Sequence, residues 1–279
     1  MRFHFVRHLS ALLLPLILTC TLCACQQSGT SEAAASSDSS SLPELKIGVD
    51  ILNPFFYKDE NGDYAGIDAE IAREACGRAG LRPVFVTISW NSKDDYLADG
   101  SVDCLWNAFS EDGRESQYLW TVPYMESELA VLVDSQCPDH SLKELHSRGG
   151  IAVRAGSKAE EVLLKDTANT LTRTEKIYSC GSFDQAKTAF IKGYTGALAC
   201  HKAVLQQIMS EYPGVYRLLE GSTMTVHLGV AFPRDADSAA CQSLDKAFTE
   251  MKQDGTISSI IARYPPDDSD AQEGGTADV

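Results

Sequence analysis

The sequence contains few basic residues, because 24 lysines and arginines stand against 39 aspartates and glutamates, for a net charge of −15. The charge becomes −17 once an amino-terminal segment that carries Arg2, Arg7 and no acidic residue is removed. An acidic chain is repelled by nucleic-acid phosphates and by anionic lipid headgroups. We therefore expect no nucleic-acid partner, and any membrane association must come from a different feature.

Long apolar runs are scarce as well. The one near the amino terminus, residues 9–22, is interrupted by Ser, Pro, Thr and Cys, and a spanning helix needs roughly 20 apolar residues. Arg2 and Arg7 precede this run, which is typical of a secretory signal. Leu22-Cys23-Ala24-Cys25 resembles the bacterial lipobox. The resemblance implies a signal peptide over residues 1–24 and a lipid on Cys25, which would anchor the protein to the outer face of the cell membrane.

The segments on either side of the central chain are polar. Residues 25–41 consist mainly of Gln, Ser, Gly, Ala and Thr, a composition that favours a flexible tether. Residues 267–279 are acidic and contain glycine, so we expect a disordered tail. The chain between them, about 225 residues over 42–266, has the length of one large domain or two smaller lobes.

The sequence lacks a CxxC pair beyond the signal segment, so it offers no zinc site of that kind, and we expect neither metal nor cofactor. Cys76 and Cys104 lie in apolar patterns, which favours buried free thiols. Export permits disulfides, and the spacing leaves their pairing open. The six cysteines beyond the signal are Cys76, Cys104, Cys137, Cys180, Cys200 and Cys241.

Predicted strands and helices alternate along the chain, which favours parallel α/β sheets. The first series runs from a strand at 45–49 through a helix capped by Asp68 to a strand at 83–88. The series restarts after Ser141, where Ser141–Glu144 and Ser157–Glu160 each form a capping-box pattern. A last apolar strand is expected over 226–232, with two helical segments behind it. We predict two lobes, with the end of the chain returning to the first.

Four stretches resemble, in the same order, four motifs of the bacterial extracellular solute-binding proteins of family 3. The first two are Asn53-Pro54-Phe55-Phe56 through Gly62 to Gly66-Ile67-Asp68, and Asp103 to Glu115 with Pro123-Tyr124 behind it. The other two are Val153-Arg154-Ala155-Gly156-Ser157 and Lys252-Gln253-Asp254-Gly255-Thr256-Ile257. One such motif is weak evidence, but the four in order span Lys46 to about Tyr264.

The resemblance implies an α/β, two-lobed periplasmic-binding-protein-like (type II) fold with two crossover hinge strands. Lobe one would comprise residues 42–133 and 227–266, and lobe two residues 134–226. By the same resemblance the protein is a monomeric substrate-binding lipoprotein of an ABC importer. It would capture a small amino-acid-like solute and present it to a membrane permease, without catalysing a reaction.

The strongest candidate for ligand binding is Arg114, because a guanidinium fork pairs both oxygens of a carboxylate. Ser110 matches a hydroxyl of the family and could donate to the same carboxylate. The backbone N–H groups of Ala108 and Ser110 could assist, and the family more often has glycine at position 108.

Lobe two is expected to contribute Ser157 and Arg154. Ser157 follows Gly156 at a predicted helix start, where free N–H groups and the helix dipole favour an anion. The plainer interpretation is that Ser157 only caps this helix with Glu160. Arg154 stands at a strand end, where the family often has a side chain that reaches the ligand.

Aromatic and acidic side chains could complete the site. Trp90 aligns with an aromatic residue that covers the ligand, and Phe55 or Phe56 could line the opposite wall. Core packing is the alternative for Phe55, and Trp106 fits core or cleft equally well. Asp50 ends the first strand and could accept a hydrogen bond from an α-amino group.

His201 departs from the family pattern, because amino-acid binders usually have an acid there that pairs the ligand's α-ammonium group. A neutral imidazole could accept a hydrogen bond, whereas a protonated one would repel the ammonium. The ligand could lack a plain α-amino group, Asp50 alone could hold the ammonium, or His201 could have no role. Two further functions remain open: a cyclohexadienyl dehydratase with His201 as general acid, and a sensory module that presents ligand to a receptor.

Overall fold

Two strand–helix series form two separate β-sheets in the computed structural model, which describes residues 42–142, 145, 150–169 and 177–265. The first sheet has the order β4-β1-β5-β13-β6. These strands are β1 (Glu44–Val49), β4 (Arg82–Thr87), β5 (Cys104–Leu105), β6 (Leu119–Trp120) and β13 (Ala231–Phe232). β1 pairs in parallel with β4 and β5, and alternate β1 residues from Leu45 to Val49 are buried. The expected period-2 pattern of a strand therefore places one face of β1 in a hydrophobic core.

The helix α1 (Ile67–Arg78) connects β1 to β4 and packs on the first sheet. Its start differs from the prediction, because the cap residue is Gly66 and Asp68 lies fully buried in the first turn. Gly66 has a φ of 114°, and a Cβ at this position would lie 2.3 Å from the carbonyl oxygen of Phe55. Only glycine fits such a backbone, which accounts for the glycine before Asp68 in the first motif.

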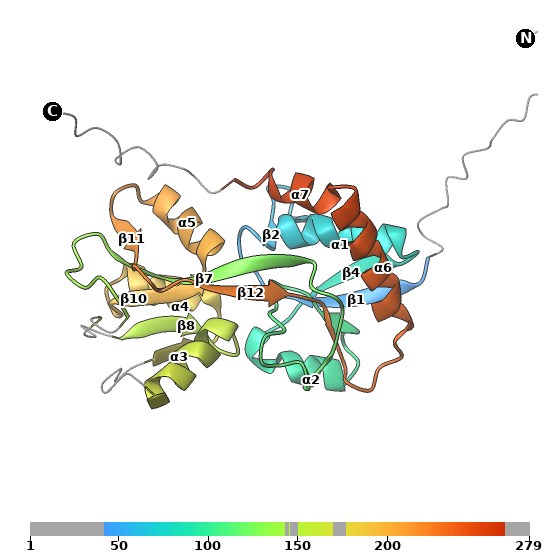
Figure 1. Cartoon of the computed structure of the whole chain (residues 1–279), viewed down its shortest axis with the longest axis horizontal. Coiled ribbons are helices and arrows are strands. Elements are labelled where there is room, and N and C mark those ends of the chain that lie inside the picture. Colours follow the sequence, from blue (N-terminus) through green and yellow to red (C-terminus); the bar gives the residue numbers. More distant parts are fainter. Residues whose placement is uncertain (1–41, 143–144, 146–149, 170–176, 266–279) are drawn as a thin grey trace, which may run out of the picture. The chain divides into compact units, whose positions relative to one another are not determined.

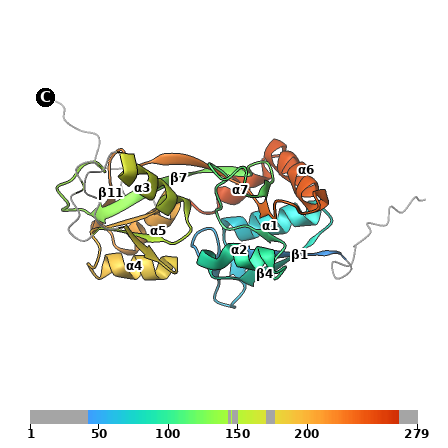
Figure 2. The same cartoon turned by 90° about the horizontal axis from the view of Figure 1, so that it is seen from below.

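The second sheet has the order β11-β7-β10-β8-β9, with β12 paired to β7. Helices α3 (Lys158–Asn169), α4 (Phe183–Ile191) and α5 (Lys202–Glu211) pack against it (Figure 2). The strands are β7 (Met125–Asp134), β8 (Ile151–Arg154), β9 (Ile177–Cys180), β10 (Ala197–His201), β11 (Tyr216–Leu218) and β12 (Met224–Leu228). We call the first sheet with its helices lobe one, and the second sheet with α3, α4 and α5 lobe two.

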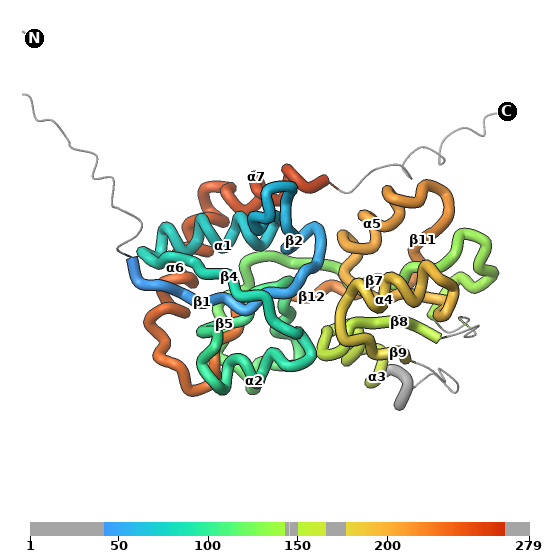
Figure 3. Tube along the Cα trace, turned by 180° about the vertical axis from the view of Figure 1, so that it is seen from behind, coloured from blue at the N-terminus to red at the C-terminus, as the bar shows by residue number. Residues whose placement is uncertain are grey.

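Two antiparallel strands, β7 and β12, connect the lobes, as the fold class requires (Figures 1 and 3). The apolar stretch 226–232 is two strands rather than the expected single one, because β12 pairs with β7 whereas β13 belongs to the first sheet. Residues 129–133 of β7 pair with β10. The expected boundary at Val133 therefore falls inside the second sheet, and the crossover begins earlier in β7.

The end of the described chain packs on lobe one, where α6 (Ala239–Gln253) and α7 (Thr256–Ile261) contact α1. Cys76 and Cys104 are free and fully buried, which confirms the expectation for these two thiols. The signal peptide, the tether, the capping box at 141–144 and the acidic tail all include residues outside the described ranges. Within those ranges, no helix has the length and apolar character needed to cross a membrane.

The remaining elements of lobe one are short. A hairpin of β2 (Tyr57–Lys58) and β3 (Tyr64–Ala65) precedes α1. The 3₁₀ turn η2 (Trp90–Ser92) leads directly into α2 (Lys93–Ala98). This turn places Trp90 beside the carboxyl ends of the parallel strands, the edge at which open α/β sheets bind ligands.

Candidate functional site

A small cavity of about 10 Å³ lies between the two lobes, close to the least volume that holds one water molecule. Seven of the nine predicted ligand-binding residues line it: Trp90, Ala108, Ser110, Arg114, Arg154, Ser157 and His201. Asp50 and Phe55 are not among the lining residues. The prediction therefore identified most of the cavity wall, although the side chains make contacts that the sequence did not indicate.

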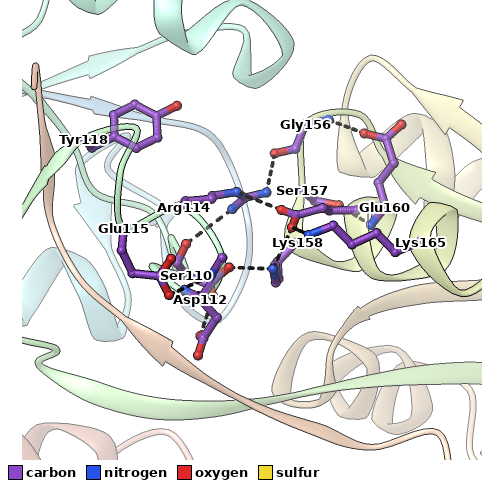
Figure 4. A network of polar contacts seen from close by, with 12 residues as sticks. Ser110, Asp112, Arg114, Glu115, Tyr118, Gly156, Ser157, Lys158, Glu160 and Lys165 are labelled. Carbon is purple, nitrogen blue, oxygen red and sulfur yellow. Dashed lines mark hydrogen bonds and ion pairs between the residues drawn. The ribbon is translucent and has the colours of Figure 1, made fainter.

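Arg114 connects the two lobes (Figure 4). Its Nε lies 3.1 Å from Oε2 of Glu161 on α3, and its Nη2 donates to the carbonyl oxygen of Gly156 at 3.5 Å. Its Nη1 donates to the carbonyl oxygen of Ser110 at 3.4 Å, so both Nη contacts are long. Burial lowers the pKa of this guanidinium, and the Glu161 carboxylate opposes that shift. The sequence prediction missed Glu161. Its spacings of three residues to Lys158 and four to Lys165 are typical of ion pairs on an exposed helix face.

The hydroxyl of Ser110 has a partner within its own loop. It donates to Oδ2 of Asp112 at 2.7 Å, and Asp112 in turn accepts from the backbone N–H of His227 at 2.7 Å. Ser110 therefore shapes the loop that carries Arg114. For Ser110 to donate to a ligand, its hydroxyl would have to leave Asp112.

The backbone N–H of Ala108 is also engaged, because it donates to Oδ2 of Asp68 at 2.6 Å. Tyr124 donates its hydroxyl to Oδ1 of Asp68 at 2.8 Å. Ala108 has a φ of 49°, the left-handed region that favours glycine, and this conformation agrees with the glycine that the family more often has there. Burial raises the pKa of Asp68 to about 7, although the two hydrogen bonds lower it. Asp68 is thus an internal support for the Ala108 turn rather than a helix cap.

Arg154 extends from the end of β8 to lobe one. Its Nη1 lies 3.2 Å from Oδ2 of Asp50, and its guanidinium carbon lies 4.8 Å from the centre of the Trp90 ring. The buried Asn107 amide lies beside the same pair, and in the orientation that satisfies both of its ends its nitrogen donates to the Asp50 carbonyl oxygen at 2.7 Å and its oxygen accepts from Nη1 of Arg154 at 3.1 Å. Asp50, which was expected to meet an α-amino group, binds Arg154 instead. Asn107 was missed because an isolated asparagine on a strand end carries no signal.

Ser157 caps α3, as the plainer interpretation predicts, and it also lines the cavity. Its Oγ accepts from the backbone N–H of Glu160 at 3.2 Å. The Glu160 carboxylate accepts from the N–H of Gly156 at 2.7 Å, one residue earlier than in the usual capping box. Gly156 has a φ of 71°, and a Cβ there would lie 3.1 Å from Nζ of Lys93. The turn therefore brings α3 and a buried lysine of lobe one close together.

His201 is buried at the end of β10. Its Nδ1 lies 2.9 Å from Oγ of Ser127, and its ring meets the edge of Phe55 with 5.3 Å between ring centres. Burial, followed by the charge of Arg154, lowers the pKa of His201 to about 3. The imidazole is therefore neutral at physiological pH, and the Phe55 ring packs against it.

Trp106, for which core and cleft were equally expected, lies in the core of lobe one. Its ring is fully buried and packs on Tyr124 and Phe248, with ring centres 5.5 and 5.4 Å apart. Lys158 is the lining residue that sequence reasoning missed most clearly, because lysines at the start of a helix are normally solvated. Its Nζ donates to the Asp112 carbonyl oxygen at 2.5 Å across the cleft.

Two α/β lobes, two crossover strands and a cavity between them that holds an arginine from each side define a two-lobed solute-binding protein of the type II class. The model for bacterial extracellular solute-binding proteins, family 3, matches residues 45–267, and the chain therefore belongs to this family.

Three curated relatives of the chain are amino-acid-binding proteins, and another is the membrane-bound lytic murein transglycosylase F of Methylobacillus flagellatus, 22% identical over 75% of this chain and 45% of that protein. The chain is 25% identical to the "Probable amino-acid-binding protein YxeM" of Bacillus subtilis over 224 residues. The aligned region covers 76% of this chain and 79% of that protein. It is 23% identical to the lysine/arginine/ornithine-binding periplasmic protein of Escherichia coli, with coverage of 83% and 92%. Among solved structures, an ancestral arginine-binding protein bound to glutamine matches with a TM-score of 0.70 at 24% identity, over 79% of this chain and 97% of that one. This last likeness shows the fold.

Proposed function

We propose that this protein is the lipid-anchored, extracellular substrate-binding component of an ABC importer, and that it captures a small amino-acid-like solute by its carboxylate. The observation that carries the proposal is the position of Arg114, a buried guanidinium whose two Nη atoms make only long hydrogen bonds at 3.4 and 3.5 Å. A ligand carboxylate offers these donors a stronger, charge-assisted pair of bonds. The protein acts alone, as a monomer, until its closed form meets the permease.

Capture requires the lobes to separate, because the cavity between them holds about 10 Å³. Contacts of the ligand with Arg154 and Ser157 on lobe two form only when the lobes close again. The ligand therefore shifts the equilibrium by its differential affinity for the closed state. A shift from 1:99 to 99:1 takes about 5.5 kcal/mol, which a few charge-assisted hydrogen bonds supply.

Binding is favoured over catalysis by the state of His201. A general acid works best with a pKa near the operating pH, whereas burial holds the pKa of His201 at about 3. A cyclohexadienyl dehydratase that relies on this imidazole would lack its proton donor at neutral pH.

The membrane anchor is proposed on Cys25, the last residue of the lipobox-like Leu22-Cys23-Ala24-Cys25. Replacing Cys25 by serine is expected to move the protein from the membrane fraction to the medium, because a lipid supplies the attachment. Fractionation of cells that express each form measures this. Retention of the variant in the membrane fraction would contradict the anchor and leave the binding function untouched.

A thermal-shift screen tests the binding function, because a ligand that binds only the folded state raises the melting temperature by mass action. Amino acids, their dimers, small carboxylic acids and polyamines form the panel. We expect a rise of several degrees with one class of carboxylate. A rise with polyamines alone, which carry no carboxylate, would contradict capture through Arg114.

A further inference from the structure

The charged side chains that line the cavity are all cationic. Arg114 comes from lobe one, Arg154 and Lys158 come from lobe two, and each is at most 7% exposed. Within the described part of the chain, no acidic residue lines the cavity. The whole chain has a net charge of −15, so this cluster reverses the sign of its surroundings and attracts anions.

Glu161, which does not line the cavity, pairs with two of these cations and with a third basic group, Lys165. Its Oε2 lies 3.1 Å from Nε of Arg114, and its Oε1 lies 2.9 Å from Nζ of Lys158 and 2.6 Å from Nζ of Lys165. One carboxylate therefore serves three basic groups. Buried cations need nearby negative charge, and the three cations of the lining have two carboxylates between them, Glu161 for Arg114 and Lys158 and Asp50 for Arg154.

Lys93 adds a further positive charge beside the cavity. It is 7% exposed, and its nearest acid, Asp94, lies 3.7 Å away with a carboxylate that is 64% exposed. Burial lowers the pKa of Lys93, the charge of Asp94 opposes this shift, and the charges of Arg114 and Arg154 add to it.

The groups that could hold an ammonium ion are occupied. The Trp90 ring is covered by the guanidinium of Arg154 at 4.8 Å, and the Asp50 carboxylate pairs the same guanidinium at 3.2 Å. The neutral imidazole of His201 points its Nδ1 to Ser127 at 2.9 Å. An ammonium group in the cleft would approach Arg154 without an acid of its own, which like-charge repulsion opposes.

Trp90, a residue of the cavity lining, also carries a donor without an acceptor. Trp90 is 1% exposed, and its Nε1 finds no hydrogen-bond partner among the residues that the structure describes. A buried donor left unpaired costs about 1–3 kcal/mol. A ligand with an acceptor oxygen within reach of this N–H would satisfy it.

We infer that the solute of this cleft is a small dicarboxylic acid without an ammonium group, held by one carboxylate on Arg114 and Lys158, which share Glu161, and by the other on Arg154. The inference rests on the proposed solute capture and names the chemical class of its ligand. It also explains why His201 stands where amino-acid binders of the family usually have an acid. A ligand that lacks an α-ammonium group needs no acid at the end of β10.

Matched pairs of acids test the inference by titration calorimetry on the purified full-length protein at neutral pH. Succinate is compared with L-aspartate, glutarate with L-glutamate and adipate with L-2-aminoadipate, and L-arginine is included. We expect the preferred dicarboxylate to bind at least about tenfold more tightly than its amino-acid counterpart. Tighter binding of the amino acid or of L-arginine would overturn the inference and leave solute capture standing. No binding by any of them would overturn both.

Two lysines on α3 provide a matched pair of variants. Lys158 lines the cavity and Lys165 does not, although both contact Oε1 of Glu161 and the Lys165 side chain is 68% exposed. K158Q is expected to weaken the dicarboxylate about tenfold, whereas K165Q retains the wild-type affinity. Equal effects of the two substitutions would mean that the lysines act through Glu161 and not on the ligand, and would overturn the assignment of Lys158.

Discussion

Replacing Arg114 by alanine is expected to weaken ligand binding about 100-fold or more, because a bidentate charged contact in a buried site contributes several kcal/mol. The fold should survive, because the Glu161 carboxylate that loses Arg114 keeps Lys158 at 2.9 Å and Lys165 at 2.6 Å. Calorimetric titration with the tightest ligand of the screen measures the affinity, and urea unfolding measures the stability. Unchanged affinity would exclude the carboxylate clamp.

A second substitution separates the clamp from the contact between the lobes. Glu161→Gln removes the carboxylate that lies 3.1 Å from Nε of Arg114 but keeps the guanidinium. If Arg114 holds the ligand, this variant binds with wild-type affinity or more tightly, because an internal anion no longer competes for the arginine. A loss as large as that of Arg114→Ala would show that the arginine only holds the lobes together.

Arg114→Lys refines the same test. A lysine keeps the positive charge but presents one ammonium in place of a planar fork, so it cannot pair both oxygens of a carboxylate in parallel. We expect an affinity between those of the wild type and the alanine variant. Wild-type affinity of the lysine variant would indicate that charge alone attracts the ligand.

The order of motifs predicted the two-lobed fold and most of the cavity lining. Several of these motifs lie in loops that follow strand ends, and such loops meet at one edge of a sheet. The pairing of Arg154 with Asp50 could not be predicted in the same way. These residues are 104 positions apart and belong to different lobes, so their contact depends on how far the lobes close. A pattern within one strand or helix contains no information about that closure.

Asp68 shows a different limit of sequence reasoning. An acid at the start of a helix is normally a solvated cap, and the period of the apolar residues behind it gave no reason to expect burial. The side chain is nevertheless fully buried, because the turn at Ala108 and the hydroxyl of Tyr124 both need an acceptor there. The packing of two segments 40 residues apart decides this role, and only the structure brings them together.

The buried carboxyl of Asp68 is expected to make the stability of the protein fall as the pH rises. Its pKa is 3.8 in its ordinary environment and about 7 in the folded state. Between these values the native state retains a proton that the unfolded state has lost, so the free energy of unfolding decreases with pH. The full stabilisation is present below about pH 4 and is lost by about pH 8, with a total on the order of 4 kcal/mol.

The substitution Asp68→Asn isolates this contribution, because the amide oxygen can still accept from Ala108 while the group no longer ionises. Relative to the wild type, the variant should gain on the order of 4 kcal/mol in unfolding free energy between pH 4 and pH 8. Urea unfolding at a series of pH values measures the difference. Tyr124→Phe serves as the control, because loss of a donor that lowers the pKa of Asp68 should move the transition to higher pH. Parallel pH curves for Asp68→Asn and wild type would show that the buried carboxyl does not titrate in this range.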